Sequence, residues 1–133
     1  MARRSLDICI CTFRRPELAD TLRSVAALDK PAGFDIGVVI ADNDDKPTAE
    51  SLVRKLADEL KLRVTYRHAP ARNISIARNA CLDASAAGFV AFIDDDETAS
   101  PGWLVELVAM ADATGAAAVL GPVRAHYHAD APD

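Results

Sequence analysis

The sequence predicts an α/β fold with a mostly parallel sheet and helices on both faces. Two observations lead to this prediction. Short apolar stretches alternate with stretches of helical spacing along the chain, and several of the apolar stretches are continuous, as in strands buried on both faces. Strands that alternate with helices imply right-handed βαβ units, so helices are expected on both sides of the sheet.

Five short, apolar stretches are predicted to be strands. They are LDICICT (6–12), IGVVIA (36–41), LRVTYR (62–67), FVAFI (89–93) and AAAVLGPV (116–123). The stretches between them are predicted to be helices, namely PELADTLRSVAAL (16–28), TAESLVRKLADEL (48–60), SIARNACLDASAA (75–87) and PGWLVELVAMADATG (101–115). The first helix has Pro16 in its first turn and apolar residues at Leu18, Leu22 and Val25, and the last is closed by Gly115.

Length and composition indicate one domain over residues 1–133, with a loose tail at 128–133. Half of the 133 residues are apolar, which is enough for a core, and the chain is short for two domains. The net charge of −5 leaves no excess of Lys and Arg to neutralise phosphates, so no nucleic-acid partner is expected. No apolar run approaches the roughly 20 residues that span a bilayer, so we expect a cytoplasmic domain.

Two pairs of potential metal ligands have strand spacing. Cys9 and Cys11 would point to one face of a strand, either as metal ligands or as small buried side chains. No second C-x-C or C-x-x-C pair is present, which favours burial, and with Cys81 the odd number of cysteines fits a reducing compartment. His126 and His128 have no third ligand in view, so a surface or tail role is favoured.

Polar side chains follow four of the predicted strands, at the edge where parallel sheets bind ligands. The segments are TFRRPE (12–17), DNDD (42–45), HAPARNIS (68–75) and DDDE (94–97). Carboxylates can chelate a divalent cation or accept hydrogen bonds from a base or ribose, and arginines can pair with phosphate. Together these groups suit a nucleoside diphosphate.

Several of these residues also have a structural interpretation. The arginines of the first loop can be solvated charges, Asp42 can cap its own turn, and Asn73 or Ser75 can cap the third helix. Arg78 in the first turn of that helix opposes the helix dipole, which favours a functional role. Trp103 either lines a sugar pocket or packs its helix against the sheet.

The acidic run Asp94–Glu97 within FIDDDET (92–98) poses a problem of charge. Like charges this close repel one another and resist desolvation, so they need either open solvent or a cation. A solvated loop is one interpretation. Because the run directly follows a buried strand of an α/β sheet, cation binding is favoured.

Four segments in order resemble the donor-binding half of inverting glycosyltransferases of family 2, which have the Rossmann-like GT-A fold. They are CTFRRPELADTLRS, VVIADND, NISIARNACLDAS and FVAFIDDDETASPGWL. The resemblance runs from Leu6 to about Tyr127 and is strongest for bacterial exopolysaccharide glucosyltransferases of the succinoglycan type. A lone D-x-D is a weak signal, whereas four motifs at the ends of successive strands are a specific one.

The resemblance implies a binding site for a UDP-sugar donor, with UDP-glucose as the leading candidate. Thr12 would help to hold the base, and Asp42 would bond to the uracil or its ribose. Arg14 and Arg78 would lie near the nucleotide or its diphosphate. The acceptor implied is a growing exopolysaccharide or a lipid-linked oligosaccharide, which would place the full-length parent at the inner membrane face.

Asp94, Asp95 and Asp96 occupy the family's D-x-D position. Asp94 and Asp95 would lie on the donor side, and Asp96 together with Asp94 would bind the Mg²⁺ or Mn²⁺ that bridges the two phosphates. The charge of this metal would explain why the aspartates are so close.

The reaction implied is an in-line displacement at the anomeric carbon, in which a carboxylate deprotonates the acceptor hydroxyl. The family places this general base well beyond the D-x-D, so it is expected beyond Asp133, and Asp130 and Asp133 are not assigned to it. We therefore expect the chain to be the nucleotide-sugar half of the enzyme, possibly inactive alone. Its missing acceptor half would leave an apolar flank exposed and lead to self-association.

Two other functions remain open. Asp94, Asp96 and Thr98 also fit the D-x-D-x-T nucleophile loop of haloacid-dehalogenase-like phosphatases, but those enzymes need a later lysine and the last one here is Lys61. A non-catalytic nucleotide-binding module is the second alternative. A dinucleotide-binding domain is disfavoured because no G-x-G-x-x-G follows the first strand.

Overall fold

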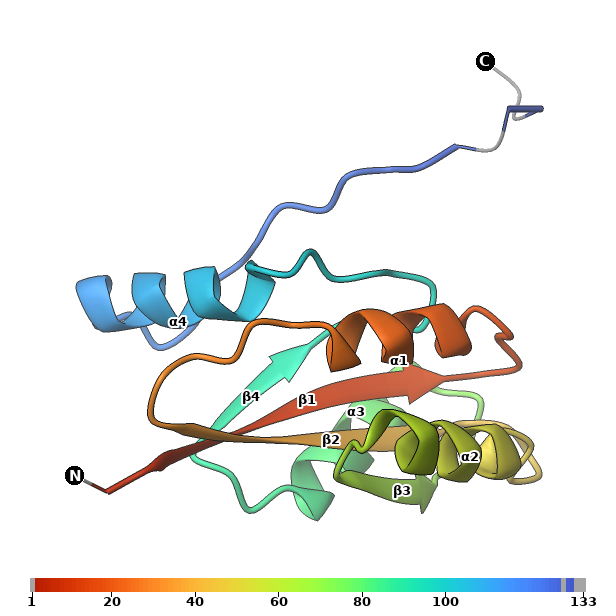
Figure 1. The fold of residues 1–133 in the computed structure, drawn as a ribbon. Coiled ribbons are helices and arrows are strands. Elements are labelled where there is room, and N and C mark those ends of the chain that lie inside the picture. Colours follow the sequence, from red (N-terminus) through yellow and green to blue (C-terminus); the bar gives the residue numbers. More distant parts are fainter. Residues whose placement is uncertain (1, 128, 131–133) are drawn as a thin grey trace.

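The computed structural model describes residues 2–127 and 129–130, and within them the chain alternates strands and helices (Figure 1). The elements are β1 (Arg4–Thr12), α1 (Leu18–Ala26), β2 (Phe34–Asp42), α2 (Glu50–Leu60), β3 (Val64–His68), α3 (Ile74–Ala84), β4 (Phe89–Phe92) and α4 (Trp103–Thr114). The α/β fold predicted from the sequence is therefore confirmed.

All the pairings in the sheet are parallel, and the strand order is β3-β2-β1-β4. β1 and β2 pair along their whole length, so that Thr12 lies level with Asp42 where the two strands end. The chain adds β2 and β3 on one side of β1 and then returns to add β4 on the other side. The strand order thus reverses between β1 and β4, and in open parallel sheets such a point is where ligands bind.

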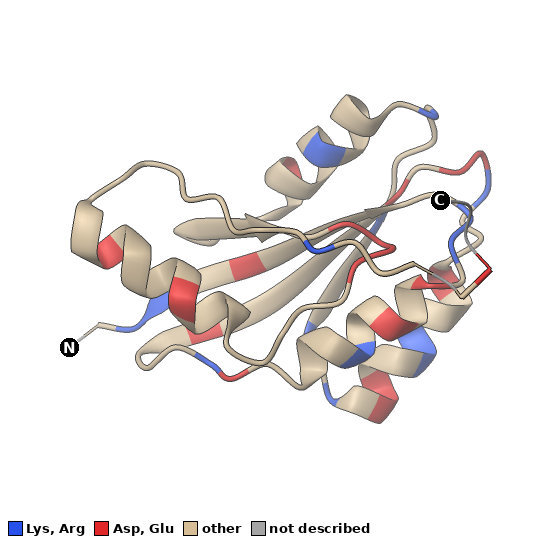
Figure 2. Cartoon of the chain, turned by 90° about the horizontal axis from the view of Figure 1, so that it is seen from above, with Lys and Arg blue, Asp and Glu red and all other residues tan. Residues whose placement is uncertain are grey.

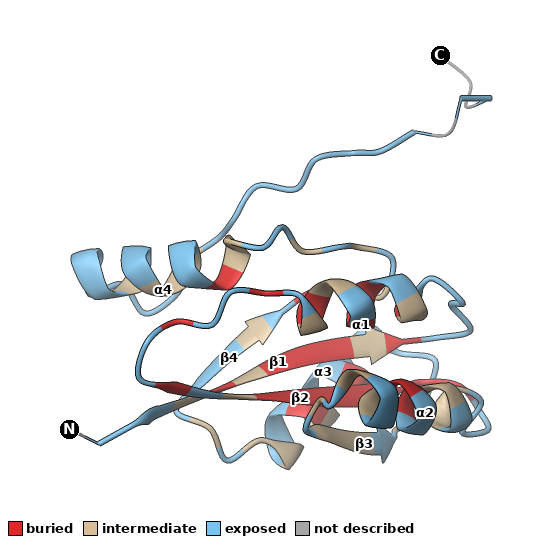
Figure 3. Ribbon diagram, viewed as in Figure 1, coloured by how far each residue is buried: buried red, intermediate tan, exposed pale blue. Residues whose placement is uncertain are grey.

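The sheet is covered on both faces, as the sequence predicts. The larger core packs α1, α2 and the start of α4 on one face, with Ile8, Ile10 and Ile40 from the strands at its centre. The smaller core packs α3 against the opposite face through Cys9, Val39, Ala41, Ala77 and Cys81. Figure 3 shows that the buried residues concentrate in β1 and β2, the two central strands.

The helix ends follow the expected chemistry. Asn73 precedes α3 in an extended conformation, and its side chain accepts hydrogen bonds from the backbone N–H groups of Ser75 and Ile76. The interpretation of Asn73 as a cap is thereby confirmed. α4 ends at Gly115, whose φ of 67° lies in the left-handed region that glycine adopts without strain.

The predicted fifth strand at 116–123 is wrong. These residues form no strand, and Leu120 and Val123 are 96% and 74% exposed. The segment instead runs back along α4, where a side chain at Gly121 would meet Leu107 and Trp103. Pro122 lacks an N–H to donate, and a strand without a hydrogen-bonded neighbour is not stable. Apolar composition alone was therefore not enough to predict a strand here.

α4 is attached to the rest of the molecule at two points. Leu104 is buried in the larger core, and Trp103 packs partly buried against it, which favours the packing role for this tryptophan. At the other end, Arg4 forms two hydrogen bonds of 2.8 and 2.9 Å with Asp112, and its guanidinium lies 4.4 Å from the centre of the Phe34 ring. The start of β1 thereby fixes the end of α4.

The edge strand β4 keeps apolar side chains in solvent. Phe89, Val90 and Phe92 are 45%, 39% and 42% exposed, although they belong to a sheet strand. Such a surface is of the kind that mediates association, and self-association stays a prediction. No helix among the described residues combines the length and the apolar character needed to cross a membrane.

The packing of a core on each face of the sheet leads to a prediction about stability. Leu22 of α1 is fully buried, whereas Leu82 of α3 is 45% exposed. Leu22→Ala should lower the free energy of unfolding by about 2–5 kcal/mol because it leaves a cavity, and Leu82→Ala by less than about 1 kcal/mol. Urea unfolding of the two variants measures the difference, and equal losses would contradict the core described above.

Candidate functional site

All four strands end at one side of the sheet, here named the carboxyl edge. The loops that begin there are residues 13–17, 43–49, 69–73 and 93–102. Figure 2 shows acidic and basic stretches side by side in loops at this edge, at the end of the molecule away from the N-terminus. The polar segments that the sequence analysis selected are therefore brought together.

Thr12 and Asp95 join the loops after β1 and β4 at the point where the strand order reverses. The hydroxyl of Thr12 donates to Asp95 Oδ2 at 2.9 Å, and the backbone N–H of Phe13 donates to the same oxygen at 3.3 Å. Arg15 Nε lies 4.0 Å from Asp95 Oδ1. Burial raises the pKa of Asp95, while these hydrogen bonds and Arg15 oppose the rise.

The acidic run folds into a turn, here named the acidic turn (Asp94–Glu97). The backbone N–H of Glu97 donates to the Asp94 carbonyl at 3.2 Å, and the Glu97 carboxylate accepts from the Asp94 N–H at 3.1 Å. Burial raises the pKa of Glu97. Asp95 points inward to Thr12, whereas Asp94 and Asp96 are exposed.

The exposed carboxylates fit a hard divalent cation. No group of three or more His, Cys, Asp or Glu side chains among the described residues is arranged to hold a metal alone. Mg²⁺ in nucleotide sites is commonly held by one or two carboxylates, with substrate phosphates and water as the other ligands. Asp94 and Asp96 offer oxygens of this type, so their chemistry fits a metal that arrives with a diphosphate.

Asp42 is fully buried and bonded to the protein. Its Oδ2 accepts from the Tyr66 hydroxyl at 2.6 Å and from the Ala49 N–H at 2.9 Å, and its Oδ1 accepts from the Asp44 N–H at 3.1 Å. The bond to Asp44 N–H is the turn cap that the sequence allowed. Contact of Asp42 with the base or ribose stays a prediction, and in this structure the carboxylate faces α2 and β3.

Asp44 is a site residue that the sequence analysis missed. Its side chain is 2% exposed and accepts from Arg14 Nε at 3.0 Å and Thr48 Oγ1 at 2.8 Å, with Arg14 Nη2 at 2.9 Å from the other oxygen. His68 Nε2 lies 2.8 Å from the Asp44 carbonyl oxygen. The Arg14 guanidinium holds the pKa of Asp44 well below its usual range. Asp44 therefore joins the loops after β1 and β2 to the end of β3.

Phe13 is a second residue that the sequence analysis passed over. Its ring is 37% exposed at the carboxyl edge, with the guanidinium of Arg14 5.0 Å and that of Arg72 5.9 Å from the ring centre. Phe13, Arg14 and Arg72 are named the Phe13 cluster below. The signal in the sequence was one aromatic residue within an otherwise polar loop.

Arg78 lies exposed on α3, on the face of the sheet opposite α1. The neighbouring Cys81 thiol and burial raise the pKa of Cys11. Cys9 and Cys81 are fully buried in the smaller core, and Cys11 packs beside them, so strand alternation did place Cys9 and Cys11 on one face.

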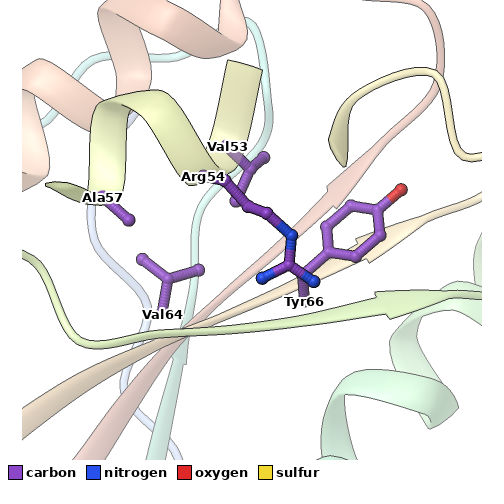
Figure 4. A pocket seen from close by; sticks show the side chains of 5 residues that line it. All are labelled: Val53, Arg54, Ala57, Val64 and Tyr66. Atoms are coloured by element: carbon purple, nitrogen blue, oxygen red, sulfur yellow. The ribbon is translucent and has the colours of Figure 1, made fainter. Parts of the chain in front are cut away.

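The surface of the described residues has two shallow hollows, one of them at the carboxyl edge. One of about 280 Å³ is lined by Arg14, Arg15, Pro16, Thr48, Ala49 and Leu52. The other, about 190 Å³, lies between α2 and β3, and Figure 4 shows Arg54 reaching over it toward Tyr66. Both are smaller than the roughly 300–1,000 Å³ of typical ligand pockets. His126 and Asp130 are exposed, while His128 and Asp133 lie outside the described residues.

The fold is that of the GT-A glycosyltransferases. The mannosyltransferase PcManGT from Pyrobaculum calidifontis, solved with GDP-Man and Mn²⁺, matches with a TM-score of 0.72 and 21% identity, over 84% of this chain and 33% of that one. Residues 1–349 of TarS from S. aureus, solved with UDP, match with a TM-score of 0.69 and 22% identity over the same shares.

The sequence assigns the chain to a family within this class. Residues 7–132 match the model of glycosyl transferase family 2, and the chain belongs to that family. It is 56% identical over 127 residues to succinoglycan biosynthesis protein ExoM from Rhizobium meliloti (strain 1021), which covers 96% of this chain and 41% of that protein. The chain thus spans about two fifths of that relative. The resemblance stated from the four motifs is confirmed, and the phosphatase alternative is not favoured.

The buried Asp44 predicts a pH dependence of stability. The unfolded chain protonates this carboxylate near pH 4, whereas Arg14 keeps it ionised in the folded protein to lower pH. The unfolded state then binds the extra proton, so Asp44 contributes stability above about pH 4 that is lost as the pH falls further.

Urea unfolding between pH 5 and pH 2.5 tests this prediction. Asp44→Asn should unfold more easily than the wild type at pH 5, and its stability should fall less steeply on acidification. Asp58→Asn, which removes an exposed carboxylate from α2, controls for the loss of one charge. Parallel curves for Asp44→Asn and the wild type would show that Asp44 does not carry the effect.

Proposed function

We propose that the chain is the donor-binding part of a metal-dependent, inverting glycosyltransferase that takes a hexose, with glucose as the leading candidate, from a UDP-sugar. One observation carries the proposal. The contact between Thr12 and Asp95 joins the loop after β1 to the acidic turn at the point where the strand order reverses. In parallel sheets this is the position at which nucleotides bind. Membership of family 2 and the UDP in the matched TarS structure support the same donor class.

The metal is proposed to bind to Asp96 and Asp94, which are the exposed carboxylates of the acidic turn. Mg²⁺ or Mn²⁺ would stabilise the negative charge of the leaving diphosphate. Asp95 faces Thr12 instead, so it is proposed to hold the turn against β1, and its predicted contact with the donor stays a prediction. The Mn²⁺ in the matched PcManGT structure supports a divalent cation.

The nucleotide is proposed to lie across the end of β1. The exposed ring of Phe13 offers a stacking surface for the base, next to Thr12, whose side chain is fixed by Asp95. Arg78 is proposed to supply positive charge for the diphosphate, whereas Arg14, which is already paired with Asp44, lies on the base side next to Phe13. Asp42 lies level with Thr12 at the end of β2 and is proposed to support the base or ribose site from within the protein, where its carboxylate binds Tyr66 and Ala49.

The acceptor is proposed to be a growing exopolysaccharide or a lipid-linked oligosaccharide at the cytoplasmic face of the membrane. The name of the 56% identical relative, a succinoglycan biosynthesis protein, supports this class. The general base would come from the part of the parent that corresponds to the rest of that relative. Transfer by residues 1–133 alone is therefore not expected, whereas donor binding is.

Calorimetric titration of UDP, with and without Mn²⁺, tests the donor site. The wild type should bind UDP in the presence of Mn²⁺ and weakly or not at all without it. Asp96→Asn should weaken the Mn²⁺-dependent binding by more than about tenfold, because it replaces a charged metal ligand. Asp83→Asn removes an exposed carboxylate from α3 and should bind as the wild type does. Equal binding by Asp96→Asn would place the metal elsewhere.

Phe13→Ala separates base binding from phosphate binding. Loss of stacking should cost about 1–3 kcal/mol of UDP binding free energy. Binding of inorganic pyrophosphate with Mn²⁺, which has no base, should change little. An equal loss for UDP and pyrophosphate would mean that Phe13 supports the loop rather than the base.

A further inference from the structure

The Phe13 cluster contains two residues in an unfavourable backbone conformation. Arg14 and Arg72 have φ values of 51° and 47°, in the left-handed region that non-glycine residues seldom adopt. Such conformations persist where the surrounding structure holds them, and they concentrate at functional sites. They belong to different loops, after β1 and after β3, yet both place a guanidinium over the same ring.

Each of these arginines is held by one of two successive aspartates. Arg14 pairs with Asp44 through two nitrogens, and Arg72 Nη2 donates to Asp45 Oδ2 at 2.6 Å. The backbone N–H of Arg72 also donates to the Asn43 carbonyl at 3.3 Å. The loop after β2 therefore fixes an arginine from the loop on either side of it.

The two ion pairs differ in strength. Asp45 and Arg72 are 59% and 57% exposed, and exposed pairs contribute little because water and salt screen them. Asp44 is 2% exposed, accepts from Thr48 as well, and pairs with Arg14 in a two-point arrangement. Charge-assisted, two-point pairs of this kind fix orientation as well as contributing energy. Asp44 is therefore the main anchor of the cluster.

We propose that Asp44 is a positioning residue for donor binding: acting through Arg14, and assisted by Asp45 through Arg72, it holds the Phe13 ring in the orientation on which the base of a UDP donor stacks. The proposal rests on the function proposed above. A ring that is already ordered loses less conformational entropy when the base arrives, so the anchor contributes to affinity without touching the ligand.

The orientation of Phe13 is measured without any ligand. The chain has four phenylalanines, and labelling with 4-fluorophenylalanine gives one ¹⁹F resonance for each. Phe13→Leu assigns the resonance of interest. In Asp44→Asn this resonance should move toward that of free fluorophenylalanine, and in Arg14→Gln it should move likewise. Asp35→Asn breaks an exposed 2.8 Å pair with Arg3 at the start of β2 and should leave it in place.

The effect on the donor is measured by titration of UDP with Mn²⁺. Asp44→Asn and Arg14→Gln should each weaken binding by about two- to tenfold, the cost of ordering one side chain. The double variant should be no weaker than the weaker single variant, because Asp44 acts through Arg14. Additive losses would mean that the two residues act independently and would overturn the proposal. If Asp44→Asn does not fold, the ¹⁹F measurement and the UDP titration are made on Arg14→Gln, because this variant alters only an exposed side chain.

The remaining outcomes are distinct. A Phe13 resonance that does not move in Asp44→Asn or Arg14→Gln overturns the proposal. A resonance that moves while UDP affinity stays unchanged also overturns it, because the orientation would then have no role in binding. The last outcome is that the Phe13 resonance moves in the variants but the wild type binds no UDP. Asp44 would then still be shown to orient Phe13, whereas the proposed donor function, and the role of the ring in it, would be overturned.

Discussion

Two buried carboxylates organise the carboxyl edge of this protein. Asp42 and Asp44 are 0% and 1% exposed, and a polar group removed from water must find hydrogen-bond donors within the protein. Asp42 takes its donors from β3 and from the start of α2, while Asp44 takes them from Arg14 and Thr48. The positions of these loops therefore follow from the need to satisfy two acids that are two residues apart.

The aspartates of the edge divide into two kinds according to where they point. Asp42, Asp44 and Asp95 point into the protein and bind its own donors, so they build the site. Asp94 and Asp96 point to solvent and stay available to a ligand. The parallel sheet makes this division possible, because it delivers several acidic loops to one edge with the backbone already fixed by the strands beneath.

The sequence predicted what depends on local pattern. Helical spacing and apolar runs identified four strands and four helices, and the rule for parallel sheets located the edge where the polar loops meet. The sequence pattern did not reveal that residues 116–123 lack a strand partner, because strand pairing depends on residues that are distant in the chain. Nor did the run DNDD (42–45) show which aspartates are buried. That depends on Arg14 and Tyr66, which are 30 and 24 residues distant from the acids that they contact.

Asp95 connects the part of the site proposed to bind the metal with the part proposed to bind the base. This residue belongs to the acidic turn, and it binds both the Thr12 hydroxyl and the Phe13 N–H. Asp94 and Asp96 carry like charges within one turn and repel one another. A bound cation would therefore stabilise the acidic turn more than the rest of the site. Phe13, by contrast, is held from the other side by arginines that Asp44 and Asp45 fix. Through Asp95 the first loop therefore contacts the acidic turn directly, and it would support that turn when a metal binds in the way proposed.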